Sequence, residues 1–193
     1  QALTVHMARP QLALTLDQKW RVAKDLLAAL AHAHHHGVVH RNLTPGAILI
    51  GQDGTTRITD FDFAKPGVDR SLTIATDIVD LVEKAYVAPE AFREPGAASS
   101  ASDIFSAGVI LYELFTGERP FAGEPTTVWD RAGEFLNKPS ALRPELNEAF
   151  DAWLQSLCAF DEHQRLTASA ALAALNALLQ PVAQAASQAA EAP

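Results

Sequence analysis

The 193-residue sequence has little of what membrane, secreted and nucleic-acid-binding proteins need. Its single cysteine, Cys158, has no partner for an internal disulfide, so we expect it to pack as a small hydrophobic side chain. No run of about eighteen apolar residues is present to span a membrane, and no charged-then-apolar leader opens the chain. With 15 Lys and Arg against 23 Asp and Glu, the net charge of −8 disfavours nucleic acid or an anionic membrane as partner. We therefore expect a cytoplasmic protein.

Hydrophobic spacing predicts a mainly helical chain. The first predicted helix begins at the capping box Thr15–Gln18, about fifteen residues into the chain, and ends at Gly37. Further helical patterns cover 101–116, 126–136, 146–159 and 167–180. Residues 181–193 are rich in alanine and predict a linker or a disordered tail, which leaves residues 1–180 as one domain.

Short strands are the predicted β elements. Apolar and β-branched residues predict strands at 38–40, 47–50 and 56–59. The last two are joined by Gly51–Gly54, a turn of the Asp-Gly kind, which predicts a hairpin. The expected fold class is mainly α with small β elements.

The segment His40–Ala47 is similar to the catalytic loop of protein kinases, H-R-D-L-x-x-x-N, with its chemical groups replaced. In that pattern the Asp accepts the proton of the attacking hydroxyl and the Asn holds a second Mg²⁺. Here these positions are Asn42 and Ala47, and Thr44 stands where the pattern has a phosphate-neutralising lysine. A carboxamide cannot take the proton and a methyl cannot bind a metal.

Other landmarks of the same family follow in order. Residues 58–65 resemble the strand that carries the D-F-G triplet, 86–90 the Y-x-A-P-E sequence, 103–108 the start of the large central helix, 111–121 its continuation, and 161–168 the approach to the final helix. The chain is therefore similar to the C-terminal lobe of bacterial Ser/Thr kinases of the Hanks type. The segment Leu72–Ile78 also resembles kinase-like domains of bacterial anti-phage defence proteins.

The resemblance covers only half of a kinase domain. Before His40 there is no G-x-G-x-x-G-x-V loop and no V-A-I-K lysine. We expect residues 1–180 to form a C-lobe with the N-lobe absent, and the sequence leaves open whether an N-lobe lies upstream.

The resemblance also implies roles for single residues. Asp60 holds the position of the first metal ligand and Leu49 the position that meets adenine, although both matter only if an N-lobe is supplied. Asp62 replaces the D-F-G glycine and Glu83 replaces the threonine that links the catalytic Asp to the lysine. The structural residues of the pattern are retained at His40, Arg41, Glu90, Asp103 and Arg165.

Two of these structural positions carry a further expectation. Glu90 and Arg165 are expected to form the buried ion pair that the family uses to anchor its activation segment. Arg41 is expected to brace the loop by hydrogen bonds; the alternative is a pair with a phosphorylated residue of the activation segment, for which Ser71, Thr73 and Thr76 are the candidates.

Four histidines, His32, His34, His35 and His36, stand together at the end of the first predicted helix. His32 and His36 are four residues apart on one helical face, but no third ligand follows at a defined spacing. Their position in the last turn suits the helix dipole. No metal site is expected here.

These patterns predict a catalytically inactive pseudokinase module that binds a protein or positions flanking domains. The alternatives are a Ser/Thr phosphotransferase, or an ATP-sensing pseudokinase, whose N-lobe lies outside this chain; only these would use ATP and Mg²⁺. Without an N-lobe, Leu49, Phe61 and Phe63 would form an exposed apolar surface, so self-association or cover by another polypeptide is expected there.

Overall fold

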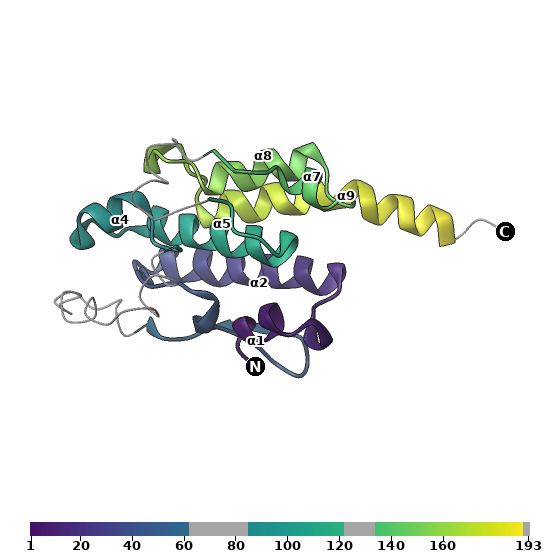
Figure 1. Ribbon diagram of the computed structural model, residues 1–193, viewed down its shortest axis with the longest axis horizontal. Coiled ribbons are helices and arrows are strands. Elements are labelled where there is room, and N and C mark those ends of the chain that lie inside the picture. The colour runs from purple at the N-terminus through teal and green to yellow at the C-terminus, as the bar shows by residue number, and fades with distance from the viewer. Residues whose placement is uncertain (62–84, 122–133, 191–193) are drawn as a thin grey trace.

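The chain folds into a helical bundle with one small sheet, as Figure 1 shows, and the described residues are 1–61, 85–121 and 134–190 of the computed structural model. The elements in chain order are α1 (Leu3–Ala8), η1 (Pro10–Leu12), α2 (Leu16–His35), η2 (Pro45–Ala47), β1 (Ile48–Ile50), β2 (Thr56–Ile58), α4 (Pro89–Arg93), η5 (Pro95–Ala97), α5 (Ser100–Thr116), α7 (Pro139–Leu142), α8 (Glu148–Leu157), η7 (Glu162–Gln164) and α9 (Ala168–Ala190). The elements marked η are short 3₁₀ turns. This mainly α fold with a two-stranded sheet is the predicted fold class.

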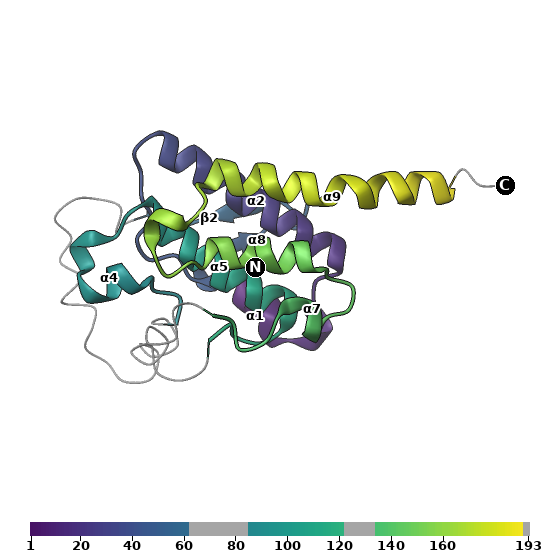
Figure 2. The same ribbon diagram turned by 90° about the horizontal axis from the view of Figure 1, so that it is seen from above.

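Helix α5 is the centre of the bundle. It packs against α2 on one side and α8 on the other, and α9 lies along both α2 and α8 (Figures 1 and 2). Ile110 and Leu111 of α5 are fully buried, as expected for a helix that is apolar on nearly all sides. The ring of Phe115 near its end contacts Trp20 of α2 and Phe150 of α8, with centroids 4.4 and 4.9 Å apart. This cluster joins three helices in one core.

The capping box predicted for α2 is present. Thr15 Oγ1 accepts a hydrogen bond from the Gln18 N–H at 3.3 Å, and the Thr15 N–H donates to Gln18 Oε1 at 2.8 Å. Each bond satisfies a donor that would otherwise lack a partner at the helix start. Gly37 follows the helix with φ +71°, a left-handed conformation that glycine adopts without strain.

The predicted hairpin also forms. Strands β1 and β2 pair antiparallel with Ile48 opposite Ile58. Gln1 and Ile50 then exchange two main-chain hydrogen bonds of 2.7 Å, so the first residues of the chain lie along the free edge of β1.

Helix α1 corrects the expectation that the first helix begins near Thr15. It has only six residues and no side-chain cap, so it is too short for a periodic signal. Leu3, which is fully buried in the core, holds it against the bundle. Tertiary packing therefore creates a helix that local propensity does not predict.

Three further expectations change. Residues 38–40 form no strand, because the N–H of His40 donates to a side chain of α5 and not to a neighbouring strand. The predicted helix at 126–136 lies mostly outside the described residues, and 134–136 are not helical. Helix α9 continues past 180 to Ala190, as the high helix propensity of alanine allows. No helix in the described part of the chain is long and apolar enough to cross a membrane.

Candidate functional site

The carboxylate of Asp103 holds the start of the loop at 40–47. Asp103 lies in the first turn of α5 and is 1% exposed. Its Oδ2 accepts from the His40 N–H and from His34 Nε2, both at 2.8 Å, and its Oδ1 accepts from the Arg41 N–H at 2.8 Å. Hydrogen bonds to an ionised acceptor are among the strongest in proteins. One side chain thus fixes the backbone of the loop relative to two helices.

His40 connects the loop to the strand that follows the hairpin. It is fully buried, and its Nδ1 lies 3.3 Å from the Asn42 N–H. Because a main-chain N–H can only donate, Nδ1 is the acceptor, and the proton is on Nε2, which donates to the Thr59 oxygen at 2.7 Å. The ring also packs against Phe61 with centroids 4.7 Å apart. Neutral His40 therefore sets the position of residue 42.

Arg41 is held in an unusual conformation. Its φ is +68°, in the left-handed region that non-glycine residues rarely occupy. Its Nε is buried and has no hydrogen-bond partner among the described residues, so the bracing expected from its side chain is not seen at that atom. The candidate phosphorylated partners at 71, 73 and 76 lie outside the described residues.

The replaced positions sit inside this retained frame. Ala47 is 3% exposed, and its carbonyl accepts from the Thr59 N–H at 2.8 Å, so the residue is part of the core. Its methyl offers no ligand atom where the family pattern has an amide. Asn42 is partly buried beside His40, and Thr44 precedes the η2 turn. None of these side chains can accept a proton from a hydroxyl at neutral pH.

Asp60 and Leu49 remain accessible. Asp60 is exposed with φ +63°, and its Oδ2 accepts from the Thr59 hydroxyl at 3.2 Å. Leu49, on β1, is 38% exposed. Asp62 and Glu83 lie outside the described residues. Within the described ranges no group of three or more His, Cys, Asp or Glu side chains lies close enough to enclose a metal ion.

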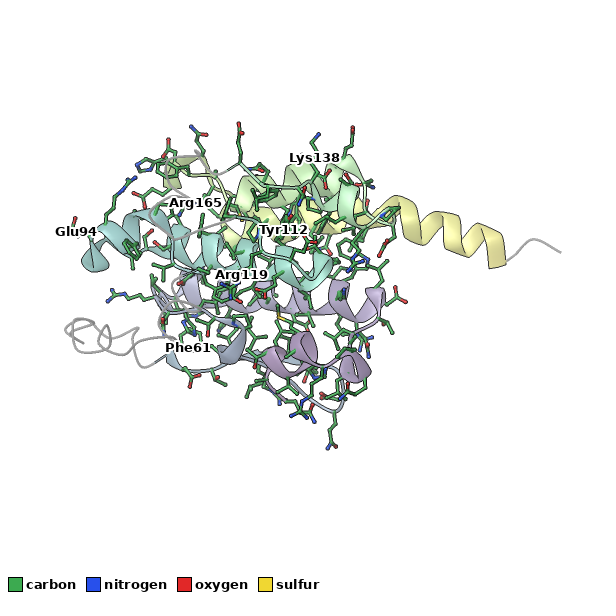
Figure 3. The ribbon with its side chains drawn as sticks, in the orientation of Figure 1. Phe61, Glu94, Tyr112, Arg119, Lys138 and Arg165 are labelled. Atoms are coloured by element: carbon green, nitrogen blue, oxygen red, sulfur yellow. The ribbon has the colours of Figure 1, made fainter. Side chains whose placement is uncertain are left out.

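The predicted ion pair of Glu90 and Arg165 forms. Arg165 Nη1 and Nη2 donate to the two oxygens of Glu90 at 2.7 and 2.9 Å, and the Ser102 hydroxyl donates to Oε1 at 2.7 Å. Burial alone would raise the pKa of Glu90, but the hydrogen bonds from Arg165 and Ser102 outweigh it and hold this pKa below its usual value. Figure 3 shows Arg165 well away from Phe61, so the pair is a support remote from the loop.

Sequence reasoning missed a contact between Tyr86 and Glu113. The Tyr86 hydroxyl donates to Glu113 Oε2 at 2.6 Å, and the guanidinium carbon of Arg119, labelled in Figure 3, lies 5.5 Å from the centre of the tyrosine ring. Burial, together with the hydrogen bond to Glu113, raises the pKa of Tyr86. The Ser106 hydroxyl donates to the Tyr86 carbonyl at 2.7 Å. Tyr86 and Glu113 are too far apart in sequence for spacing to reveal the pair.

The helical lobe, the hairpin and the loop anchored by Asp103 define a protein-kinase-like lobe. A family model described as "Protein kinase domain" matches residues 3–175, so the chain belongs to the protein kinase family.

Relatives with this likeness are bacterial serine/threonine kinases. The chain is 33% identical over 156 residues to the probable serine/threonine-protein kinase PknB of Lactococcus lactis subsp. lactis, covering 80% of this chain and 24% of that protein. It is 34% identical over 152 residues to the DNA damage-responsive serine/threonine-protein kinase RqkA of Deinococcus radiodurans, covering 78% and 22%. It is 41% identical over 103 residues to the serine/threonine-protein kinase PknL of Mycobacterium tuberculosis, covering 53% and 25%. The chain spans about a quarter of the length of these relatives.

Proposed function

We propose that this chain is a catalytically inactive kinase-family module that acts through protein contacts or regulation. One observation carries the proposal: the loop backbone is anchored by Asp103 and His40, while the positions that perform chemistry carry Asn42, Thr44 and Ala47. Loss of fold would have been expected to affect the anchors as well. The sequence has kept the residues that shape the loop and changed those that transfer phosphate.

The size of the loss supports inactivity. General-base assistance is typically worth about 10²- to 10⁴-fold in rate. The missing base, second metal ligand and phosphate lysine act on one transition state, so their losses are not simply additive. No described side chain near residue 42 supplies a replacement base, since His40 is buried and both its ring nitrogens are already bonded.

The alternative is a Ser/Thr kinase, or an ATP-sensing pseudokinase, completed by residues outside 1–193. Exposed Asp60 and Leu49 favour it, because they hold the metal-ligand and adenine positions of the family pattern. The relatives are named as serine/threonine kinases, but this chain matches only part of each. ATP and Mg²⁺ would be the cofactors only in this case.

A phosphate-transfer assay distinguishes these functions. Wild type and Asn42→Asp would be incubated with radiolabelled ATP, Mg²⁺ and a generic protein substrate, both as this chain and within the full-length native protein. We expect no transfer above background from either, because Thr44 and Ala47 remain unchanged. Transfer that disappears in Asp60→Asn would contradict the proposal and establish the kinase alternative.

Nucleotide binding is measured separately by calorimetry. We expect this chain to bind neither ATP nor ADP with Mg²⁺, because most phosphate ligands of the family pattern are not among its residues. Micromolar binding that Asp60→Asn weakens would favour the ATP-sensing alternative.

We assign the protein contact to the surface of Leu49 and Phe61. Leu49 is one of few large apolar side chains that are more than a third exposed among the described residues, and Phe61 is partly exposed. Exposed apolar surface of this kind marks interfaces more often than chance. Light scattering of wild type against a Leu49→Glu, Phe61→Glu double variant tests it. Self-association that the double variant abolishes supports the assignment, whereas a monomeric wild type no less soluble than the variant rejects it.

A further inference from the structure

The end of α2 carries three exposed imidazoles that the kinase-like site does not use. His32 and His35 lie in the last turn, and His36 is the residue that caps it. The fourth histidine, His34, points elsewhere and bonds Asp103. At His36 the backbone leaves the helix, with φ −91° and ψ 11°, while its N–H still bonds the carbonyls of Ala33 and His32.

The His36 ring is oriented by a main-chain hydrogen bond. Its Nδ1 lies 2.8 Å from the His32 carbonyl oxygen. Because that oxygen can only accept, Nδ1 carries the proton, and the lone pair of Nε2 is left free. Metal-binding histidines commonly donate their other ring N–H to a backbone carbonyl, which fixes the tautomer and the ring orientation. His36 therefore has the support of a ligand without an assigned ion.

The spacing of the His32 and His36 rings suits one shared ion. Their centroids are 4.5 Å apart. A metal lies about 2.0 to 2.1 Å from an imidazole nitrogen, and each nitrogen is about 1.1 Å from its ring centre, so two rings bound at about 90° have centroids about 4.5 Å apart. A tetrahedral angle would need a wider separation.

We propose that His32 and His36 form a two-histidine clamp for a divalent transition-metal ion, with Cu²⁺ preferred. A right-angled pair of imidazoles fits two neighbouring positions of a tetragonal Cu²⁺ centre, and Cu²⁺ leads the affinity order of the divalent first-row ions. No third His, Cys, Asp or Glu completes a cluster among the described residues, so water fills the remaining positions. Sequence spacing alone did not support this site; the orientation of His36 and the distance between the rings do.

The clamp is connected to the anchored loop. It closes the same turn that holds His34 against Asp103, and Asp103 in turn holds His40 and Arg41. An ion that binds only the folded turn stabilises it by mass action. Copper is therefore expected to raise the melting temperature and to slow hydrogen exchange at the His40 amide.

The test is a Cu²⁺ titration of the chain prepared without a polyhistidine tag. Binding is followed by calorimetry, and electron paramagnetic resonance reports the nitrogen ligands. His32→Ala and His36→Ala should each weaken binding at least tenfold and remove the rise in melting temperature. His163→Ala, which removes an exposed histidine from η7, should change neither.

Two results would overturn the clamp. One is wild-type affinity in both His32→Ala and His36→Ala, which would move the copper to another group. The other is an equal loss in His163→Ala, which would mean that the ion binds histidines without a defined site. Circular dichroism of each variant confirms that the fold is unchanged, so neither result can come from unfolding.

Discussion

The guanidinium of Arg165 meets the carboxylate of Glu90 through two nearly parallel hydrogen bonds of 2.7 and 2.9 Å. The remaining donors of Arg165 are also used, since they bond the main-chain oxygens of Ala159, Phe160 and Ala101. Glu90 belongs to α4 and Arg165 precedes α9, so the pair ties the segment after the kinase-like loop to the last helix.

Arg165→Ala should destabilise the domain by about 3 to 5 kcal/mol, because it leaves the Glu90 carboxylate desolvated without its partner. Urea denaturation followed by circular dichroism measures the change in the free energy of unfolding. Arg9→Ala, at an exposed position near α1, is the matched control and should change stability by less than about 0.5 kcal/mol. Equal midpoints for the two variants would mean that the pair contributes nothing.

The same pair predicts a pH dependence. The pKa of Glu90 is lower in the folded protein than its usual value, so the pair contributes stability above the unfolded pKa of about 4.3 and loses it as the pH falls through the folded pKa. The free energy of unfolding should therefore fall on acidification below about pH 4 more steeply in wild type than in Glu90→Gln. Parallel curves for the two proteins would show that Glu90 does not titrate with folding.

Asp103→Asn should loosen the anchored loop. The amide keeps one oxygen for three donors, so at least one of the bonds to His34, His40 and Arg41 is lost. We expect about 1.5 to 3 kcal/mol of destabilisation, the usual value of a hydrogen bond to a charged group. Native-state hydrogen exchange should show at least tenfold faster exchange at the His40 and Arg41 amides.

Asp17→Asn is the control for that measurement. Asp17 is an exposed carboxylate in the first turn of α2, so its substitution removes a charge without touching the loop. Unchanged exchange at His40 and Arg41 in Asp103→Asn would contradict the role given to Asp103.

The sequence predicted those parts of the molecule whose signals are local or follow family motifs. The capping box at Thr15, the hairpin turn at Gly51–Gly54 and the Glu90–Arg165 pair all appear as expected. Helix α1 was not predicted, because it depends on the burial of Leu3 against residues distant in sequence. The strand predicted at 38–40 was wrong for a similar reason, since Asp103 supplies the acceptor for the His40 N–H.

The site shows the same division. Motif positions identified the replaced loop residues, but no motif indicated that the Nε of Arg41 would be buried without a partner or that Tyr86 would bond Glu113. These features arise where segments from different helices meet. Periodicity and spacing describe one segment at a time, so they carry no information on such contacts.

The last prediction concerns the close approach of α5 to the end of α8. A Cβ added at Gly108 would lie 2.5 Å from Cys158 Sγ and 2.9 Å from Leu157 Cβ, well inside normal contact. Both neighbours are fully buried, so neither can move aside easily. Gly108→Ala should therefore destabilise the domain by about 1 to 3 kcal/mol, the usual cost of overpacking a core. Gly96→Ala, where a Cβ would meet nothing within 4 Å, is the control and should be nearly neutral.

A double-mutant cycle then identifies the contact responsible. Cys158→Ala removes the sulfur that the new methyl would strike, so Gly108→Ala should cost less in that background than in wild type. The rescue should be partial, because Leu157 still lies close to the added atom. Thermal and urea unfolding of the four proteins give the coupling energy between the two positions. A coupling energy of zero would mean that the helices separate to admit the methyl, and that the glycine at 108 is not required by the packing of α5 on α8.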